Sequence, residues 1–471
     1  MSKLKAKALV CSIIIAVLAV AMMAAIPVYA LNNAGKLDVE GSSTVYPISQ
    51  AAQPDFQAWT GSGSPTSFVT APITAPASAP YAGYTFPFVS TTLTLNNQGS
   101  GGGITAWEKG TIDIAASSKT GLAGGIFGAT YPLTFGSGSS AYTGVVTDPE
   151  EFQIGYDSVA IIVNSQNTWI TQLDAQEVCN LFTVTTNGGT TPVYPTWGAW
   201  ATAYGVTLPS GVASQPITHI GREFSSGTFD GFNTFFLKPF GKDMTYSASS
   251  GTTAGNWTTP DYQQLTSNQA VLTAMGESSN EYAIAFIALG MIQNDIGSSH
   301  PDSVIPLNMY NPTTSTYIQP FIKNVKNNSY VSDEPTGAVT IIRALWYFMN
   351  GIPSANSADA VKSLWISFVK SNDAYLTSTG YLTMWRDDMA SATANAGNPN
   401  TSVGTQTVPD GVVDFNDLVY FASAWIAFYG PTHALNPYAD ITGPNGHPDG
   451  IIDFNDLVAF ANGWIAYYAT Q

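Results

Sequence analysis

The chain has 471 residues, enough for two packed lobes and a further small domain. Only 10% of the residues are charged, and 32 acidic against 15 basic residues give a net charge of −17. Because nucleic-acid binding needs a basic surface, this balance argues against nucleic acid as a partner.

The first thirty residues have the pattern of an export signal. Three lysines precede an apolar run over residues 8–26, and residues 28–30 form a small-residue cleavage site. We expect cleavage after Ala30. The alternative is retention as a membrane anchor, since about 19 apolar residues just suffice to span a bilayer. Both interpretations place the rest of the chain outside the cytoplasm.

Three glycine- and serine-rich turns follow, each ahead of a segment that can start a helix. They are Gly41-Ser42-Ser43-Thr44, Gly99-Ser100-Gly101-Gly102-Gly103 and Arg222-Glu223-Phe224-Ser225-Ser226-Gly227-Thr228. Unpaired N–H groups give a helix N-terminus a partial positive charge, so three such turns meeting at one point would bind an anion. Arg222 would add the one full positive charge, and its planar guanidinium suits a tetrahedral oxyanion.

Apolar runs and helical periodicity alternate along the chain. Residues 61–90, rich in Gly, Ser, Pro, Thr and Ala, indicate an extended loop or insertion. Val159–Val163 and Ala283–Leu289 predict short buried strands, whereas Thr336–Phe348 and Asp359–Val369 predict helices. This alternation predicts α/β lobes.

The order of the turns, together with Ala115-Ala116-Ser117-Ser118 and Gly155-Tyr156-Asp157-Ser158, resembles a known family. It is similar to the phosphate-binding proteins of bacterial and archaeal phosphate ABC importers, in the periplasmic binding protein superfamily. The resemblance implies a type II two-lobed clamshell over residues 31–390. One lobe would comprise about 36–150 and 303–390, and the other about 155–300.

The resemblance also implies a function and a set of ligands. The protein would be a monomeric binding protein, not an enzyme, that captures inorganic phosphate and delivers it to an ABC permease in the membrane. The ligands implied residue by residue are Ser43, Thr44, Val45, Ser100, Ser118, Arg222, Ser226, Gly227 and Thr228.

One position departs from part of the family. Where some members have an aspartate that accepts a hydrogen bond from protonated phosphate and rejects sulfate, this chain has Ser118. Asp157 and Asp113 are candidate replacements, although a strand-end hydrogen bond or a helix cap explains each more simply. Selectivity against sulfate therefore stays open.

The tail, residues 391–471, follows a linker-like run and contains a repeat. Asp410–Gly430 and Asp449–Ala469 both carry Asp-Gly-x-x-Asp-x-x-Asp ahead of an apolar helix. This pattern resembles dockerin type I repeats and implies a small all-α tail with EF-hand-like calcium loops. The implied ligands are Asp410, Asp414 and Asp417 in the first repeat, and Asp440, Asn445, Asp449, Asp453 and Asp456 in the second. Calcium is favoured at the second repeat, and an Asp-capped helix pair without metal is the alternative.

The apolar helices of the repeats leave two interpretations open. Exposed apolar surface would suit a cohesin-like or cell-surface partner, whereas docking of the helices onto the lobes explains the same residues equally well. The alternative function is accordingly a cell-surface attachment protein with a calcium-stabilised tail, whose clamshell binds another oxyanion or acts as a sensor. No organic cofactor is expected in either case.

Overall fold

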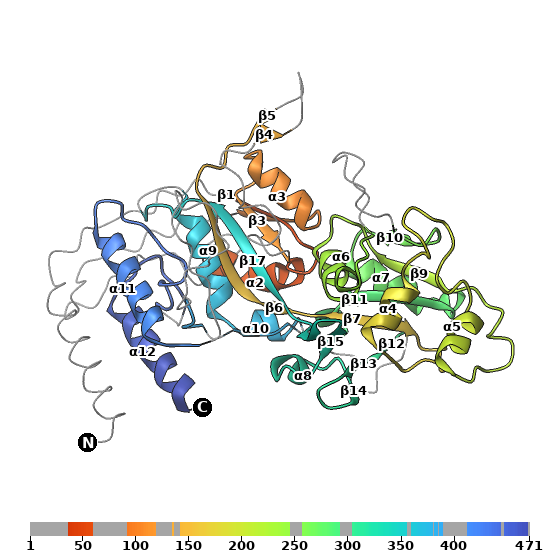
Figure 1. Cartoon of the computed structure of the whole chain (residues 1–471). Coiled ribbons are helices and arrows are strands. Elements are labelled where there is room, and N and C mark those ends of the chain that lie inside the picture. Colours follow the sequence, from red (N-terminus) through yellow and green to blue (C-terminus); the bar gives the residue numbers. More distant parts are fainter. Residues whose placement is uncertain are drawn as a thin grey trace.

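The computed structural model describes residues 36–59, 92–118, 134–135, 142–244, 257–292, 304–355, 359–379, 381–384, 386–389, 412–443 and 447–469. Within them the chain forms two α/β lobes and a helical tail, which confirms the predicted fold class (Figure 1). The predicted signal, the 61–90 insertion and the linker lie outside these residues. Among the helices in these ranges, none combines the length and apolarity needed to span a membrane.

The first lobe is built on a five-stranded sheet with the order β2-β1-β3-β17-β6. Its strands are β1 (Lys36–Gly41), β2 (Thr92–Asn97), β3 (Ile114–Ser117), β6 (Pro149–Asp157) and β17 (Arg343–Asn350). β1 runs parallel to β2 and β3, whereas β17 is antiparallel to β3 and β6.

Helices cover both faces of this sheet. They are α2 (Tyr46–Trp59), α9 (Ala360–Ser371) and α10 (Ala374–Thr377) on one face and α3 (Ser100–Glu108) on the other. Successive side chains of β17 alternate between the faces, so Tyr347 contacts Trp365 of α9 and Phe348 contacts Trp107 of α3. Burial on both faces explains the unbroken apolar run of this strand.

The second lobe is built on a five-stranded sheet with the order β10-β9-β11-β7-β12. Its strands are β7 (Val159–Asn164), β9 (Thr218–Arg222), β10 (Gln263–Leu265), β11 (Ala283–Ala288) and β12 (Val304–Pro306). Its main helices are α4 (Ala175–Leu181), α6 (Gly227–Phe232), which continues as η2 (Asn233–Leu237), and α7 (Asn268–Gly276). Every residue of β7 and β11 is buried, and both predicted strands are confirmed.

Smaller elements complete the structure. The short helices are α5 (Trp197–Tyr204), η3 (Lys238–Phe240), η4 (Ser278–Asn280), η5 (Leu289–Met291) and α8 (Ile322–Lys326). The short strands are β4 (Thr134–Phe135), β5 (Tyr142–Thr143), β8 (Gln172–Leu173), β13 (Asn308–Asn311), β14 (Thr316–Ile318), β15 (Val331–Glu334) and β16 (Gly337–Thr340).

The lobes are joined by crossings that lie side by side. β6 continues into β7 through Ser158, and the chain returns to the first lobe through residues 341–342 into β17. The Ser158 hydroxyl donates to the Ile341 carbonyl, and Asp157 lies opposite Arg343 in the β6/β17 register. These contacts tie the two crossings into one hinge.

Two predictions about residues 303–390 are wrong. Thr336–Phe348, predicted as a helix, forms β16 and most of β17, because a continuously buried apolar run has no periodicity that separates helix from strand. Residues 304–341, predicted to belong to the first lobe, pack in the second, where Leu307, Val325 and Ile341 join the core. The predicted helix at Asp359–Val369 is confirmed by α9.

The tail helices α11 (Phe415–Tyr429) and α12 (Phe454–Ala469) pack on each other and on the first lobe. Phe421 and Phe460 stack between them with ring centroids 5.6 Å apart. The Tyr438 hydroxyl binds both backbone groups of Gln153, and its ring lies 5.2 Å from that of Phe152. Docking onto the lobes, one of the two interpretations left open, therefore accounts for much of the apolar sequence of the tail.

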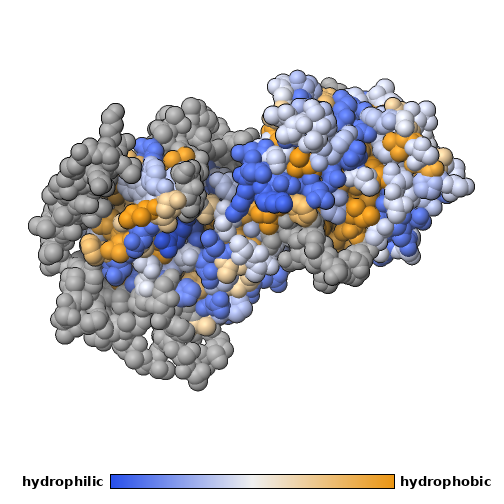
Figure 2. All heavy atoms as spheres, turned by 90° about the horizontal axis from the view of Figure 1, so that it is seen from below, coloured by the Kyte–Doolittle hydropathy of each residue, from blue (hydrophilic) through white to orange (hydrophobic). Residues whose placement is uncertain are grey.

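Part of each tail helix nevertheless stays exposed. Six exposed apolar residues occupy matching positions in the two repeats, namely Phe415 and Phe454, Val419 and Val458, and Ile426 and Ile465. Figure 2 shows hydrophobic surface at this end of the molecule.

Candidate functional site

The three predicted turns meet where the lobes face each other. Arg222 at the end of β9 donates through Nη1 to the Ser43 hydroxyl of the first lobe. The hydroxyls of Thr44 and Thr228, one from each lobe, lie 3.1 Å apart. All four of these residues are buried. The two lobes therefore contribute to one cluster of polar side chains.

Glycines allow the first two turns to approach each other. Gly41 ends β1 at φ 139°, a conformation that L side chains rarely adopt, and a Cβ there would overlap the Ala116 carbonyl. A Cβ on Gly103 of α3 would likewise overlap the backbone of Gly41. After this junction Ser42 accepts hydrogen bonds from the N–H groups of Thr44 and Val45 at 3.1 and 3.4 Å. The Val45 side chain lies in the core, so this residue could reach a ligand only through its backbone, whose N–H already makes the long contact with Ser42.

The third turn starts α6 against the first lobe. Ser226 caps the helix and accepts from the Thr228 N–H at 3.1 Å. A Cβ on Gly227 would overlap the Ser118 hydroxyl and lie 2.8 Å from that of Ser100. Glycine at this position therefore lets the second lobe touch the serines of the first.

Those serines form a hydrogen-bonded chain. The Ser118 hydroxyl lies 3.0 Å from Ser42 and 3.4 Å from Ser100, and the Ser118 N–H donates to the Ser100 hydroxyl at 3.1 Å. Ser42 already accepts two backbone N–H groups, so it donates its proton to Ser118. The bond to Ser100 then uses either the proton or the second lone pair of Ser118, so Ser118 keeps one of the two for an anion.

Arg222 is fully buried and held in a fixed orientation. Its Nε and Nη2 lie 3.1 and 2.6 Å from the Glu223 carboxylate, and both also donate to the carbonyls of Leu265 and Thr266. Burial lowers the pKa of Arg222 and Glu223 opposes that shift. The remaining Nη1 is the group directed at Ser43 and the other lobe.

A second arginine, missed by the sequence reading, lies in the same cluster. Arg343 at the start of β17 places Nη2 3.1 Å from the Thr44 hydroxyl and 3.2 Å from that of Thr228. The same nitrogen lies 2.6 Å from the Asp157 carboxylate. The expectation of a single full positive charge was therefore wrong. The chain has three arginines, and tertiary structure brings two of them together here.

Asn268, also missed, completes the cluster. It is the first residue of α7, and its Nδ2 lies 3.4 Å from the Thr44 hydroxyl and 3.2 Å from that of Thr228. Its Oδ1 accepts from the Ala288 N–H, which fixes the orientation of the amide. Ser267, the residue before Asn268, caps α7 and is a local signal for the start of that helix. It gives no signal that Asn268 lies beside the three turns.

The two candidate acceptors in place of the family aspartate are otherwise engaged. Asp157 forms the ion pair with Arg343; burial raises its pKa and the arginine opposes this. Asp113 accepts from the Asp38 N–H at 2.9 Å and pairs with Lys362 at 3.3 Å, which is the simpler strand-end role. Each guanidinium of the cluster thus has its own carboxylate, and hydrogen-bond donors rather than net charge dominate the site.

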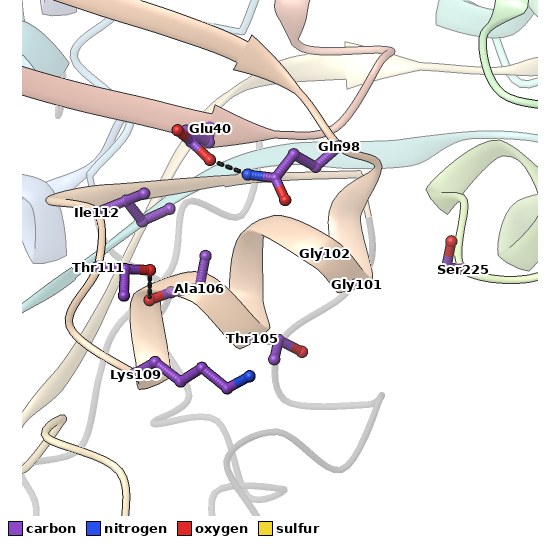
Figure 3. Close-up of a pocket in the computed structure, with 10 residues that line it drawn as sticks. All are labelled: Glu40, Gln98, Gly101, Gly102, Thr105, Ala106, Lys109, Thr111, Ile112 and Ser225. Atoms are coloured by element: carbon purple, nitrogen blue, oxygen red, sulfur yellow. Dashed lines mark hydrogen bonds between the residues drawn. The ribbon is translucent and has the colours of Figure 1, made fainter.

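An open pocket of about 790 Å³ lies beside the second turn. Figure 3 shows Ser225 of the second lobe facing Gly101 and Gly102 of α3 across it. None of the nine predicted ligands lines this pocket, although the Gly101 N–H donates to the Ser225 carbonyl at 3.3 Å. The pocket therefore neighbours the buried cluster but is not the cluster itself.

The tail repeats share their local geometry. In both, the third Asp of the motif accepts from the backbone of the second, Asp417 from Asp414 and Asp456 from Asp453, each at 2.7 Å. In the first repeat this is a helix capping box. Asp410 and Asn445 lie outside the described residues.

The second repeat contains four buried aspartates. Asp440 accepts from the N–H groups of Asp449 and Gly450, and Asp456 accepts from those of Ile441 and Thr442. Burial raises the pKa of Asp440, Asp449 and Asp456. Carboxylate oxygens suit a hard cation, but across the described ranges no group of three or more His, Cys, Asp and Glu side chains is arranged to hold a metal ion.

Several solved structures are similar to the chain. A putative phosphate ABC transporter substrate-binding protein with bound phosphate from Clostridium perfringens is 16% identical, with a TM-score of 0.44, covering 74% of this chain and 99% of its own. An ABC-type phosphate transport receptor from Vibrio cholerae is 18% identical, with a TM-score of 0.42 and coverages of 74% and 99%. A phosphate-binding protein from Stenotrophomonas maltophilia is 16% identical, with a TM-score of 0.42 and coverages of 80% and 100%.

The family assignment has a separate basis. A search of curated proteins finds no match. A family model described as a PBP superfamily domain matches residues 32–341, which include β1, the second lobe and all three turns. This match spans more than half of the chain, and we conclude that the chain belongs to the PBP superfamily.

Proposed function

We propose that this protein is an extracytoplasmic solute-binding protein that captures inorganic phosphate for uptake by an ABC permease. The observation that carries the proposal is the buried cluster between the lobes, where Arg222 and Ser43 meet across the interface. Phosphate is favoured among oxyanions because the turns match those of phosphate-binding proteins residue by residue. The proposed role is binding rather than catalysis.

A cluster shared by two lobes suits a protein that closes on its ligand. An anion that receives hydrogen bonds from both lobes favours the closed state over the open one by its differential affinity. A permease can then distinguish loaded from empty protein by the closure itself. The hinge formed by the paired crossings is where such a motion would take place.

Calorimetric titration tests the phosphate proposal. We expect one phosphate to bind per chain, and Arg222→Ala to abolish the signal because it removes the buried guanidinium whose Nη1 is directed at the first lobe. Arg386→Ala is the matched control, since it deletes the same side chain beside the tail, away from the lobe interface. Absence of phosphate binding by the unaltered protein would overturn the proposal.

We also propose that the tail is dockerin-like and binds calcium at its second repeat. Support comes from the buried Asp440, Asp449, Asp453 and Asp456, which bring negative charge into the interior. Because these four side chains are not arranged as a metal site in the described structure, they would have to move to hold the ion, and calcium would then offset their repulsion.

Thermal unfolding with calcium or a chelator tests this second proposal. Calcium should raise the melting temperature of the unaltered protein, and Asp449→Asn should remove the increase. Asp414→Asn, at the capping position of the first repeat, is the control that should keep it. An increase that survives Asp449→Asn and Asp453→Asn together would place the ion elsewhere. The cohesin-like partner of the tail stays a prediction.

A further inference from the structure

The buried Arg222 of the anion cluster is held by an edge strand of the second sheet. β10 pairs with β9 over only three residues and stands at the end of the strand order. We propose that Asp261 and Tyr262, the two residues before β10, are positioning residues that fix this strand on β9, so that Arg222 turns a single nitrogen, Nη1, towards the anion. The inference rests on the proposed phosphate function and adds two residues to the nine predicted ligands.

Counting the protons of the Arg222 guanidinium shows which of them are used. Nε carries one proton, which the Leu265 carbonyl at 3.0 Å and the Glu223 carboxylate at 3.1 Å share. Nη2 carries two protons, and its acceptors are the Thr266 carbonyl at 2.9 Å and the Glu223 carboxylate at 2.6 Å. These four contacts use all three protons. Nη1 keeps two protons, one for Ser43 and one for a ligand.

Half of these acceptors belong to β10 and to the residue after it. The Leu265 carbonyl also accepts from the Glu223 N–H at 3.2 Å, in the parallel ladder where Leu265 pairs with Arg222. Because successive backbone groups of a strand point to opposite edges, a shift of β10 by one residue would turn the Leu265 carbonyl away from β9. A ladder of three residues resists such a shift only weakly, so the register needs a further constraint.

Tyr262 supplies this constraint at the Arg222 end of β9. Its hydroxyl donates to the Arg222 carbonyl at 2.7 Å, and its ring is nearly parallel to those of Phe224 and Phe286, with centroids 6.0 and 6.4 Å away. Gly221 makes room for the hydroxyl, since a Cβ there would lie 2.5 Å from its oxygen. One side chain therefore binds the backbone of Arg222, and the same residue leads directly into the strand that accepts from the guanidinium.

Asp261 anchors the segment at a second point of β9. Its two carboxylate oxygens lie 3.0 and 2.9 Å from Nδ1 of His219, a fully buried residue of that strand. An ionised carboxylate only accepts, so Nδ1 donates. The two bonds to β9, at His219 and at Arg222, are three residues apart, which together hold the segment in one register.

Calorimetric titration with inorganic phosphate measures the effect on binding. Tyr262→Phe keeps the ring but leaves the Arg222 carbonyl without its donor, and we expect phosphate binding to weaken about tenfold. Tyr438→Phe is the matched control, since it removes a hydroxyl that binds the backbone of Gln153 beside the tail. It should lower stability without changing phosphate affinity.

The guanidinium itself provides a second readout, by NMR. The chain has three arginines, so isotopic labelling of arginine nitrogen should give three Nε–H signals, and Arg222→Lys identifies that of Arg222. Without phosphate, Tyr262→Phe should make the Arg222 Nε–H exchange with water about tenfold faster, while the rates of Arg343 and Arg386 stay the same. A general loss of stability would instead raise all three rates.

Two changes at Asp261 separate its hydrogen bond from its charge. Asp261→Ala and Asp261→Asn remove the same negative charge, but the amide oxygen of asparagine can still accept from His219. We therefore expect Asp261→Ala to bind phosphate several-fold more weakly than Asp261→Asn, and to exchange the Arg222 Nε–H faster. The Asp261 side chain is 41% exposed, so this pair carries the test if Tyr262→Phe does not fold.

The possible outcomes distinguish the positioning role from the phosphate function. An unchanged phosphate affinity or an unchanged Arg222 exchange rate in folded Tyr262→Phe would overturn the role of Tyr262. Equal affinities of Asp261→Ala and Asp261→Asn would overturn that of Asp261. If the unaltered protein binds no phosphate, the proposed function fails, and the exchange rates still decide whether the two residues orient Arg222.

Discussion

At the residue scale, each of the two buried arginines between the lobes lies beside a carboxylate that offsets its charge. Arg222 has Glu223 and Arg343 has Asp157, both within 2.6 Å. A buried charge without such a partner is costly, so each pair lets a guanidinium stay in the interior, where its hydrogen bonds are strong. A protein with a net charge of −17 can therefore still offer hydrogen-bond donors to an anion.

Glu151 of β6 illustrates the cost of burial. It is 6% exposed, and burial raises the pKa of its carboxyl from 4.5 to about 8. Because the folded-state pKa is raised, the folded protein binds the proton more tightly than the unfolded chain does. The resulting stability is complete below the ordinary pKa and is lost as the pH rises towards 8.

Glu151→Gln should remove this pH dependence. We expect little change in the free energy of unfolding at acidic pH and a gain of about 2–5 kcal/mol for the variant above pH 8. Urea unfolding over a pH series measures the difference. Glu277→Gln, at an exposed position, is the control for the loss of one negative charge. A pH-independent difference for Glu151→Gln would show that titration of this carboxyl does not govern stability.

At the element scale, the local sequence pattern predicted those helices and strands whose formation depends mainly on their own residues. The strands β7 and β11 are short apolar runs and α9 has helical periodicity, so each was predictable. β17 was not, since its apolar run lacks periodicity and its strand pairing is set by β3 and β6, more than 180 residues earlier in the chain. The turns were recognisable from glycine and serine alone, but Arg343 and Asn268 reach them only through tertiary structure.

Gly227→Ala tests the approach of the third turn to the first lobe. The added methyl group would overlap the Ser118 hydroxyl and crowd Ser100, so the turns should separate and phosphate affinity should fall about 10- to 100-fold. Titration calorimetry measures the loss. In Gly101→Ala the new methyl group meets the Ser225 carbonyl at an ordinary 3.4 Å, so this control should retain most affinity. Equal affinities for both variants would contradict the close approach.

Gly463→Ala tests the docking of the tail. The first repeat has Ala424 at the matching position, and alanine favours a helix by about 1 kcal/mol over glycine. Here, however, a Cβ would overlap the Asp387 carboxylate of the segment beneath α12, so we expect a lower melting temperature. Asn462→Ala, at the exposed neighbouring position, should be neutral or stabilising. Stabilisation by Gly463→Ala, or failure of Asp387→Ala to rescue it, would count against this packing.

At the scale of the whole molecule, the anion cluster and the tail lie apart. Figure 1 shows the tail helices on the side of the first lobe remote from the second lobe. The cluster lies beside the hinge at residues 157–159 and 341–343. Among the described residues, those of the tail share a hydrophobic core with the first lobe and not with the second. Lobe movement can therefore proceed with the tail carried as part of the first lobe.

A crystal structure of the protein grown with phosphate would show whether the three turns form one anion site. We predict one phosphate between the lobes, bound at the same time by Arg222 of the second lobe and by Ser43 and Ser100 of the first, with the Thr44 and Thr228 hydroxyls directed at it. Phosphate held by one lobe alone, or found only in the open pocket beside α3, would contradict the claim that the three turns form one anion site.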